Sequence, residues 1–284
     1  MIYVSSSCSK QKKIGAAIRE LAEHGFQNIE LSGGTEYYEG YEDDILELKE
    51  KYNLNFLVHN YFPPPKEDFV LNLASLDDTI FEKSLKHLRN AIQLSFLLGA
   101  EKFGFHAGFY VDIGANEIGK AISAQRLCNT RQAYERFCNG FNSIKNKSKE
   151  IQIYIENNVY SKTNFSTYGL QNPFMLTSLT EYRELQHHID FKLLLDVAHL
   201  YVSSRTLGFD FDSHLDQMIM ETDYIHLSDN DGYHDQNAPF MTDSKLINKI
   251  KKKHIEDKTI TLEIYTGING LKASFDHIEA IVDD

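Results

Sequence analysis

The chain has 284 residues, of which 42% are hydrophobic and 25% are charged, and its formal net charge is −12. This composition is typical of a soluble globular protein, and no apolar run approaches the roughly 20 residues that a membrane helix requires. The acidic balance argues against a nucleic-acid-binding protein, since such proteins usually display a basic face. The first residues place apolar side chains before lysines, the reverse of a secretory signal, so we expect a cytoplasmic protein.

Short segments rich in β-branched and aromatic residues recur along the whole chain and predict strands. The predicted strands are Ile2–Ser5, Asn28–Leu31, Asn55–His59, Lys102–His106, Gln152–Glu156, Lys192–Asp196, Tyr224–His226 and Thr259–Glu263.

Segments with the period of a helix lie between these strands. In 82–98, Leu85, Leu88, Ile92 and Phe96 follow one another at steps of three and four, and Gly99 marks the expected end of the helix. The other predicted helices are 10–23, 42–51, 123–147, 177–188, 210–221, 243–253 and 271–282.

This alternation of strands and helices predicts a parallel sheet. Eight such units in fewer than 300 residues favour a single (β/α)8 TIM barrel over residues 1–284 more than an open, doubly wound sheet. No GxGxxG sequence follows the first strand, which removes the commonest reason to prefer the open sheet. We therefore expect one domain.

Residues that commonly bind metals stand at the ends of six successive predicted strands. They are His59, His106, Glu156, Asp196 with the nearby His199, His226 and Glu263. In a barrel of this type the catalytic residues come from the carboxyl ends of several strands. A carboxylate or an imidazole against the apolar wall of a barrel is costly unless a metal or another partner satisfies it.

Four of these residues form the metal site that we predict: Glu156, Asp196, His226 and Glu263. Three oxygen donors and one imidazole suit Mn²⁺, Mg²⁺ or Co²⁺ better than a closed structural zinc site, with Mn²⁺ expected first and Zn²⁺ left open. Taken singly, each residue has a simpler explanation; Asp196, for example, could cap a helix.

Several short motifs, in their order along the chain, carry a resemblance to a known group of proteins. They are LNLAS (71–75), FHAGF (105–109), IEN (155–157), LLDVAH (194–199), IHLSDNDG (225–232) and LEIY (262–265). The chain resembles the xylose-isomerase-like TIM barrels, a superfamily that holds sugar and sugar-phosphate isomerases and epimerases and also the endonuclease IV-type nucleases. The resemblance runs along nearly the whole chain.

The resemblance implies a metal-dependent isomerase or epimerase that acts on a small sugar or sugar phosphate. It implies that Glu156 and Glu263 bind the metal and also transfer a proton through an enediolate, and that Asp196 and His226 complete the metal site. It places His199 where the family often holds a substrate oxygen. A divalent metal in such a site acidifies the carbon-bound proton and stabilises the enediolate.

Three further expectations concern the same end of the barrel. His59 and His106 are expected to bind the substrate or, with Glu156, a second metal ion. Tyr61 and Phe62, which follow His59 directly, are candidates for an apolar platform under a sugar ring. The oligomeric state stays open, with a homo-oligomer as one possibility, and we expect no membrane contact.

Two alternatives stay open. His59, His106 and His199 match positions at which the nuclease branch holds extra zinc ions, which would make the chain a metal-dependent phosphodiesterase. That branch also carries an Asp-x-His pair after the seventh strand, and Asp235-Gln236-Asn237 has asparagine in place of the histidine. The third possibility is a carbohydrate-binding barrel without catalytic activity.

Overall fold

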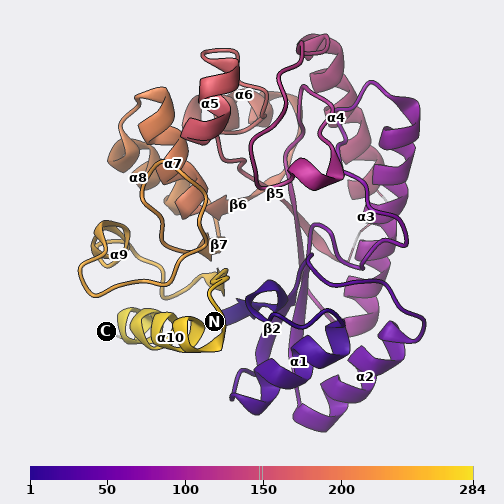
Figure 1. The fold of residues 1–284 in the computed structure, drawn as a ribbon, viewed down its shortest axis with the longest axis vertical. Coiled ribbons are helices and arrows are strands. Elements are labelled where there is room, and N and C mark those ends of the chain that lie inside the picture. Colours follow the sequence, from indigo (N-terminus) through magenta and orange to yellow (C-terminus); the bar gives the residue numbers. More distant parts are fainter. Residues whose placement is uncertain (147, 149, 284) are drawn as a thin grey trace.

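A computed structural model describes residues 1–146, 148 and 150–283. Eight parallel strands close into a barrel in the order of the sequence, and the helices surround it, which confirms the predicted (β/α)8 fold (Figure 1). The strands are β1 (Ile2–Ser5), β2 (Asn28–Leu31), β3 (Asn55–His59), β4 (Lys102–His106), β5 (Gln152–Glu156), β6 (Lys192–Asp196), β7 (Tyr224–Leu227) and β8 (Thr259–Leu262).

The strand bounds differ from the prediction only in the last two strands. β7 extends one residue further, to Leu227, and β8 ends at Leu262, so Glu263 lies directly after the strand. The backbone N–H of Glu263 nevertheless donates to the carbonyl of Leu227 at 3.1 Å, which continues the ladder between the two strands. The position of this glutamate at the end of the barrel is unchanged.

The main helices that surround the barrel are those that the sequence predicts, although several are shorter than predicted and those predicted at 42–51, 82–98 and 271–282 are longer. They are α1 (Ile14–Glu23), α2 (Tyr41–Tyr52), α3 (Asp78–Leu98), α4 (Thr130–Lys145), α6 (Leu179–His188), α8 (Phe211–Met220), α9 (Lys245–Ile250) and α10 (Ile268–Val282). Two further helices, α5 (Lys162–Tyr168) and α7 (Val197–Leu207), and the short 3-10 helices η1 (Ser6–Cys8) and η2 (Ala115–Glu117), were not among the predicted ones. Asp196 does cap a helix, as its sequence position allowed: its Oδ1 accepts from the N–H of His199 at 2.7 Å at the start of α7.

Two helix predictions need correction. The predicted helix 123–147 begins only at Thr130, because the side chain of Asn129 caps it by accepting from the N–H of Gln132 at 3.1 Å; residue 147 lies outside the described residues. In α3, Phe96 is 61% exposed. The buried face of α3 instead runs through Leu88, Ala91 and Leu98, so the predicted stripe marks one edge of that face.

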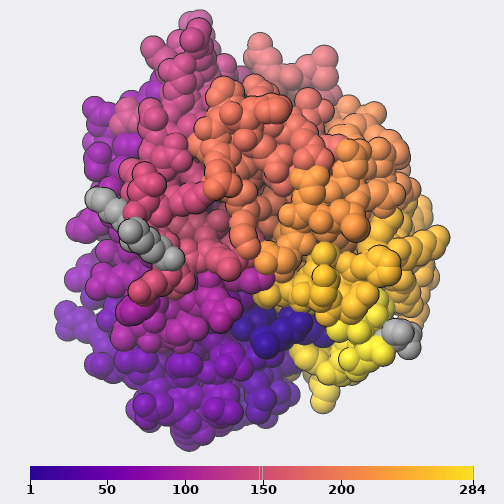
Figure 2. Space-filling view, turned by 180° about the vertical axis from the view of Figure 1, so that it is seen from behind, coloured from indigo at the N-terminus to yellow at the C-terminus, as the bar shows by residue number. Residues whose placement is uncertain are grey.

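The two ends of the chain meet where the barrel closes. β1 pairs with β2 on one side and with β8 on the other, with Ile2 opposite Ile260. The colours in Figure 1 pass around the ring in sequence order, and Figure 2 shows the dark N-terminal residues beside the yellow C-terminal segment on the opposite face. The N-terminal ammonium donates to the carbonyl of Lys258 at 3.0 Å at this seam.

Among the described residues, a small apolar cluster around Tyr160 and Phe174 lies among the segments after β4 and β5, and two other apolar clusters belong to the barrel itself. The larger one lies between the strands and the helices, and each large side chain fully buried there stabilises the fold by about 1.5–3 kcal/mol. The smaller one fills the inside of the barrel and consists of Tyr3, Leu57, Ala100, Tyr154, Leu194 and Tyr224; we call it the inner cluster. Among the described residues, no helix has both the length and the apolar character needed to cross a membrane.

Candidate metal centre

The inner cluster shows which side chains of the strands point into the barrel, and so where the polar strand-end residues point. Side chains two positions apart in a strand lie on the same face of the sheet. Glu156 follows Tyr154 by two residues, and Asp196 follows Leu194 in the same way. His226 likewise follows Tyr224. All three side chains therefore project into the barrel, one layer nearer its carboxyl end than the inner cluster.

Contacts between neighbouring strands hold this layer in register. His106 lies opposite Glu156 in the ladder between β4 and β5, and Asp196 lies opposite His226 in the ladder between β6 and β7. The amide of Asn157 bonds to both main-chain groups of Asp196: its Nδ2 donates to the carbonyl at 2.9 Å and its Oδ1 accepts from the N–H at 2.8 Å. This asparagine thus fixes the end of β6 against that of β5.

The structure brings together the four residues of the predicted metal site. Each of Glu156, Asp196, His226 and Glu263 offers a ligand atom that lies within 4.8 Å of the others, and all four side chains are buried. Nδ1 of His226 is 3.5 Å from Oε1 of Glu156 and 3.6 Å from Oε2 of Glu263. We call these four residues the central cluster.

Several polar atoms of this layer are buried without a partner, which tests whether a cation fits. Oε1 of Glu156, Oδ2 of Asp196, Nδ1 of His226 and Nδ1 of His106 make no hydrogen bond within the part of the chain that the structure describes. Leaving one such atom unsatisfied costs about 1–3 kcal/mol. Because all of these atoms can donate a lone pair, and oxygen and imidazole donors suit divalent cations, the residues fit a metal ion.

The ionisation of the central cluster reflects its burial and its crowding. Burial raises the pKa of Asp196 to about 7; His199 opposes this shift, and the charges of Glu156 and Glu263 add to it. For His226, burial lowers the pKa, but Glu30, Glu263 and Glu156 raise it well above its usual value. In the metal-free protein, protons held by these groups therefore compensate part of the buried negative charge.

The histidines of the neighbouring strands surround Glu156. Nε2 of His59 is 2.7 Å from Oε2 of Glu156, and Nδ1 of His106 is 3.3 Å from the same oxygen. Ligand atoms of His106, Glu156 and His199 lie within 4.8 Å of one another, and so do those of His59, Glu156 and His226. Among the described residues, no such group contains both His59 and His106. The two histidines of the predicted second metal site therefore belong to different groups, each of which includes Glu156.

A cavity of about 550 Å³ opens beside these residues. The predicted site residues that line it are His59, Tyr61, His106, His199 and Glu263. Its rim also carries side chains from the loops after β1, β4 and β8, among them Ser7, Lys10, Glu117, Lys120 and Tyr265.

The predicted aromatic platform needs a correction. Tyr61 lines the cavity, and its hydroxyl accepts from the N–H of Leu71 at 3.2 Å. Phe62 is fully buried and packs edge-on against Tyr41 of α2, with ring centroids 6.2 Å apart. It joins the large apolar core between strands and helices and offers no surface to a substrate. Of the predicted pair, only Tyr61 therefore faces the cavity.

The segment after β7 also approaches the site. Nε2 of His199 lies 3.5 Å from Asp235, and its Nδ1 is 2.9 Å from the carbonyl of Asn157. His234 turns to Asp231, 2.7 Å away, and Asn237 accepts from the hydroxyl of Ser228 at 3.3 Å. The segment after β7 thus adds a carboxylate, Asp235, beside His199 at the start of α7, whereas the imidazole of His234 pairs with Asp231.

Sequence reasoning missed Glu30, a fully buried carboxylate on β2. Burial raises its pKa, but the adjacent imidazoles of His226 and His59 lower it to about 2. The alternation of Ile29, Glu30 and Leu31 in a predicted strand contains the signal, since it places the glutamate alone on the inner face of the barrel. Tyr265, whose hydroxyl donates to Oε1 of Glu263 at 3.3 Å, was also missed as a site residue.

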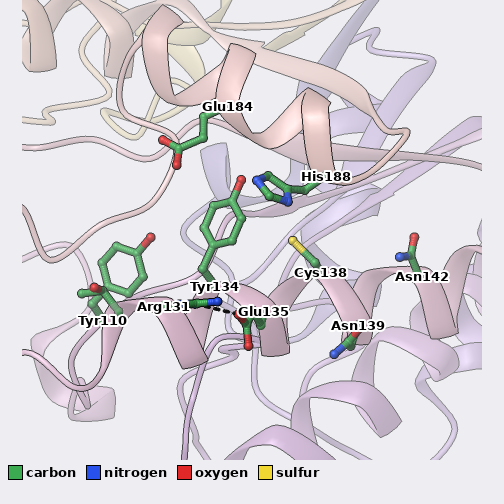
Figure 3. Close-up of a pocket in the computed structure, with 10 residues that line it drawn as sticks. Tyr110, Arg131, Tyr134, Glu135, Cys138, Asn139, Asn142, Glu184 and His188 are labelled. Atoms are coloured by element: carbon green, nitrogen blue, oxygen red, sulfur yellow. Dashed lines mark hydrogen bonds and ion pairs between the residues drawn. The ribbon is translucent and has the colours of Figure 1, made fainter.

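A second cavity, of about 700 Å³, lies outside the barrel between α4 and α6. Figure 3 shows Tyr134 and Cys138 of α4 below His188 and Glu184 of α6, and it marks the ion pair of 3.1 Å between Arg131 and Glu135. The lining of this second cavity contains none of the strand-end residues discussed above. The cavity at the end of the barrel is therefore the one beside the strand-end residues of the predicted site.

Comparisons with known proteins agree with this architecture. The chain is 23% identical to an uncharacterized protein of Methanocaldococcus jannaschii over 77% of each chain. A D-tagatose 3-epimerase-like protein has a similar structure, with a TM-score of 0.74, 19% identity, and coverage of 99% of this chain and 97% of that one. Endonuclease IV from Thermus thermophilus superposes with a TM-score of 0.61 and 16% identity, over 98% of this chain and 99% of that one.

The match to a family extends over most of the sequence. Residues 18–281, from α1 to α10, match the family described as the xylose isomerase-like TIM barrel. The fold, the order of the strand-end motifs and this match agree with one another, and the chain belongs to the xylose isomerase-like TIM barrel family.

Proposed function

We propose that the protein is a metal-dependent isomerase or epimerase of a sugar or sugar phosphate. One observation carries the proposal: two glutamates, Glu156 and Glu263, approach the same point from strands on different sides of the barrel, together with Asp196 and His226, beside a cavity of about 550 Å³. The epimerase name of a similar structure supports this choice among reactions of the family.

The central cluster would hold the metal. A divalent cation, with Mn²⁺ expected first and Zn²⁺, Co²⁺ or Mg²⁺ as alternatives, would polarise a carbonyl and a neighbouring hydroxyl as a Lewis acid. His59, His106 and His199 line the cavity and would bind substrate oxygens. Tyr61 would contact the sugar ring from the wall of the same cavity.

The two glutamates would transfer the proton. Glu263 lines the cavity and can remove a proton from a substrate carbon directly. Glu156 is fully buried and held by His59 at 2.7 Å, so its orientation is fixed before a substrate enters. Returning the proton to the adjacent carbon of an enediolate gives isomerisation, and returning it to the opposite face of the same carbon gives epimerisation.

Deuterium uptake from heavy water across a panel of sugars and sugar phosphates tests this function. Glu156→Gln and Glu263→Gln keep the side-chain shape and one oxygen donor but cannot act as a base at neutral pH, so both should lose exchange by about 100-fold or more. Metal content is measured in each variant at saturating Mn²⁺. Glu117→Gln is the matched control, because Glu117 lines the same cavity outside the central cluster.

A variant that keeps its metal and exchanges at the wild-type rate removes that glutamate from the mechanism. If both variants do so, the proposed isomerase mechanism is wrong. Binding of a sugar without any exchange would support the carbohydrate-binding barrel instead.

We also propose a second ion, held by His106, Glu156 and His199, in place of the set with His59 and His106 together. The three ligand atoms lie within 4.8 Å, and Nδ1 of His106 makes no hydrogen bond among the described residues. His106→Ala should then reduce the metal content at excess Zn²⁺ from two ions per chain to one. One ion per chain in the wild-type protein under the same conditions would contradict the second site.

The contact between His199 and Asp235 favours a second candidate function, a metal-dependent phosphodiesterase. The similarity to endonuclease IV supports it, whereas the net charge of −12 and Asn237 in place of a histidine oppose it. Cleavage of an abasic-site DNA duplex by the metal-loaded protein, abolished by Asp235→Asn, would favour this candidate. Absence of cleavage alongside sugar exchange would exclude it.

A further inference from the structure

Glu30 lies beneath the central cluster and takes several hydrogen bonds. Its carboxylate accepts from the hydroxyl of Thr261 at 2.8 Å, from that of Ser32 at 3.3 Å and from that of Tyr224. Nε2 of His226 lies 3.2 Å from the same carboxylate. These four donors come from three strands or strand ends, β2, β7 and β8, so the carboxylate is fixed from several sides.

The imidazole of His226 therefore has two different environments. Its Nε2 faces the carboxylate of Glu30, which can only accept, so that nitrogen carries the hydrogen. Its Nδ1 faces Glu156 and Glu263 and makes no hydrogen bond within the described residues. In the neutral ring, the lone pair is consequently on Nδ1 and points at the central cluster.

We propose that Glu30 is a positioning residue of this centre: it holds His226 in the Nε2–H form and aims the Nδ1 lone pair at a bound divalent cation. The inference rests on the proposed metal-dependent function. Outer carboxylates that accept from a ligand histidine in this way fix its tautomer and raise its basicity as a ligand.

Glu30 itself is not expected to bind the metal ion directly. One of its oxygens lies within 4.8 Å of ligand atoms of His59 and Glu263, which would allow direct coordination. Each of its two oxygens, however, already accepts a hydrogen bond: Tyr224, Thr261 and His226 bond to Oε2, and Ser32 donates to Oε1. The central cluster, in contrast, has unpaired oxygens on Glu156 and Asp196 among the described residues.

Calorimetric titration of the full-length protein with Mn²⁺ tests the inference without reference to activity. Glu30→Gln keeps the size of the side chain but removes the charged acceptor, so we expect the affinity to fall about 10- to 100-fold. Thr261→Val is the matched control. It removes one hydrogen bond to the same buried carboxylate and leaves the contact with His226 in place, so its affinity should stay close to that of the wild type.

Nitrogen NMR of the zinc-loaded wild-type protein, labelled with ¹⁵N in histidine, gives a readout that does not depend on how Glu30→Gln folds. The ring signals of His226 are assigned by their loss in His226→Asn. We expect a metal-bound Nδ1 and a protonated Nε2. A merely structural role for Glu30 would not fix which of the two nitrogens binds the ion.

The outcomes of these experiments distinguish the proposed role of Glu30 from the proposed metal-dependent function. A metal-bound Nε2 in the wild-type protein, or wild-type affinity in a folded Glu30→Gln, overturns the role of Glu30 and leaves the metal site standing. Loss of affinity in Thr261→Val as large as in Glu30→Gln also overturns it. A wild-type protein that binds neither Mn²⁺ nor Zn²⁺ overturns the proposed function, and the inference with it.

Discussion

Metal binding by the central cluster is expected to weaken steeply as the pH falls below about 7, the value to which burial raises the pKa of Asp196. A proton on this carboxylate competes with a cation, and so does a proton on His226, whose pKa lies well above its usual value despite burial because of Glu30, Glu263 and Glu156. Binding must displace both protons. Metal affinity therefore rises with pH.

The size of this pH effect on metal affinity follows from the number of protons that the ion displaces. Each proton displaced lowers the apparent affinity about tenfold per pH unit below the pKa of its group, which is about 1.4 kcal/mol. With Asp196 and His226 both protonated, the loss between about pH 6 and pH 5 approaches a factor of roughly 100.

The folding stability of the metal-free protein depends on pH in the opposite direction to the metal affinity. The pKa of Asp196 is raised from 3.8 to about 7 in the folded state, so its contribution to stability is present below 3.8 and is lost as the pH rises through 7. The increase in melting temperature on adding Mn²⁺ should consequently grow between about pH 5 and pH 8.

Calorimetry with Mn²⁺ at several pH values measures the slope, and buffers of different ionisation enthalpy count the protons released. Asp196→Asn carries no titrating proton at this position, so its residual binding should release about one proton fewer than the wild type does. Affinity that is independent of pH between about 5 and 8 would refute the reasoning. Equal proton release by Asp196→Asn and the wild type would show that Asp196 is not displaced by the ion.

Three predictions concern the supporting fold, each measured by denaturant unfolding. Leu194→Ala opens a cavity in the inner cluster and should cost about 2–5 kcal/mol, and a loss below about 1 kcal/mol would mean that this layer collapses around the gap. Gly104→Ala should cost about 1–3 kcal/mol, because the added Cβ would lie 2.6 Å from Leu194 and 3.2 Å from His59; wild-type stability would contradict this. Asp77→Ala removes the cap of α3, which accepts from the N–H of Thr79 at 2.7 Å, and should cost about 1 kcal/mol, whereas Asp77→Asn should cost less.

Most of the fold could be predicted because the strands of this barrel carry strong local signals. The bounds of β1 to β6 agree with the prediction, since each strand is a short run of β-branched, aromatic or leucine residues. Two helices lacked such a signal. α7 buries residues on most of its surface, so it has no polar stripe to reveal a helical period, and α5 is only seven residues long.

The site could be predicted in part for the same reason. The strand ends were well placed, so the residues at their ends were brought together as expected, within 4.8 Å in the central cluster. The grouping of His59, His106 and His199 around Glu156 depends on side-chain directions, and sequence spacing does not contain those directions. The burial of Phe62 against Tyr41 depends on the path of a loop after β3, which strand patterns do not determine.

The layered structure of the barrel interior supports a functional origin for its charges. One layer of inward side chains is apolar and includes Tyr154, Leu194 and Tyr224, while the next layer along the same strands holds Glu156, Asp196 and His226. Replacing buried ion pairs by apolar residues of similar size is often neutral or stabilising, so stability does not require the charged layer. Ionisable residues occupy these positions and leave ligand atoms unpaired among the described residues, and both features favour the metal site proposed above.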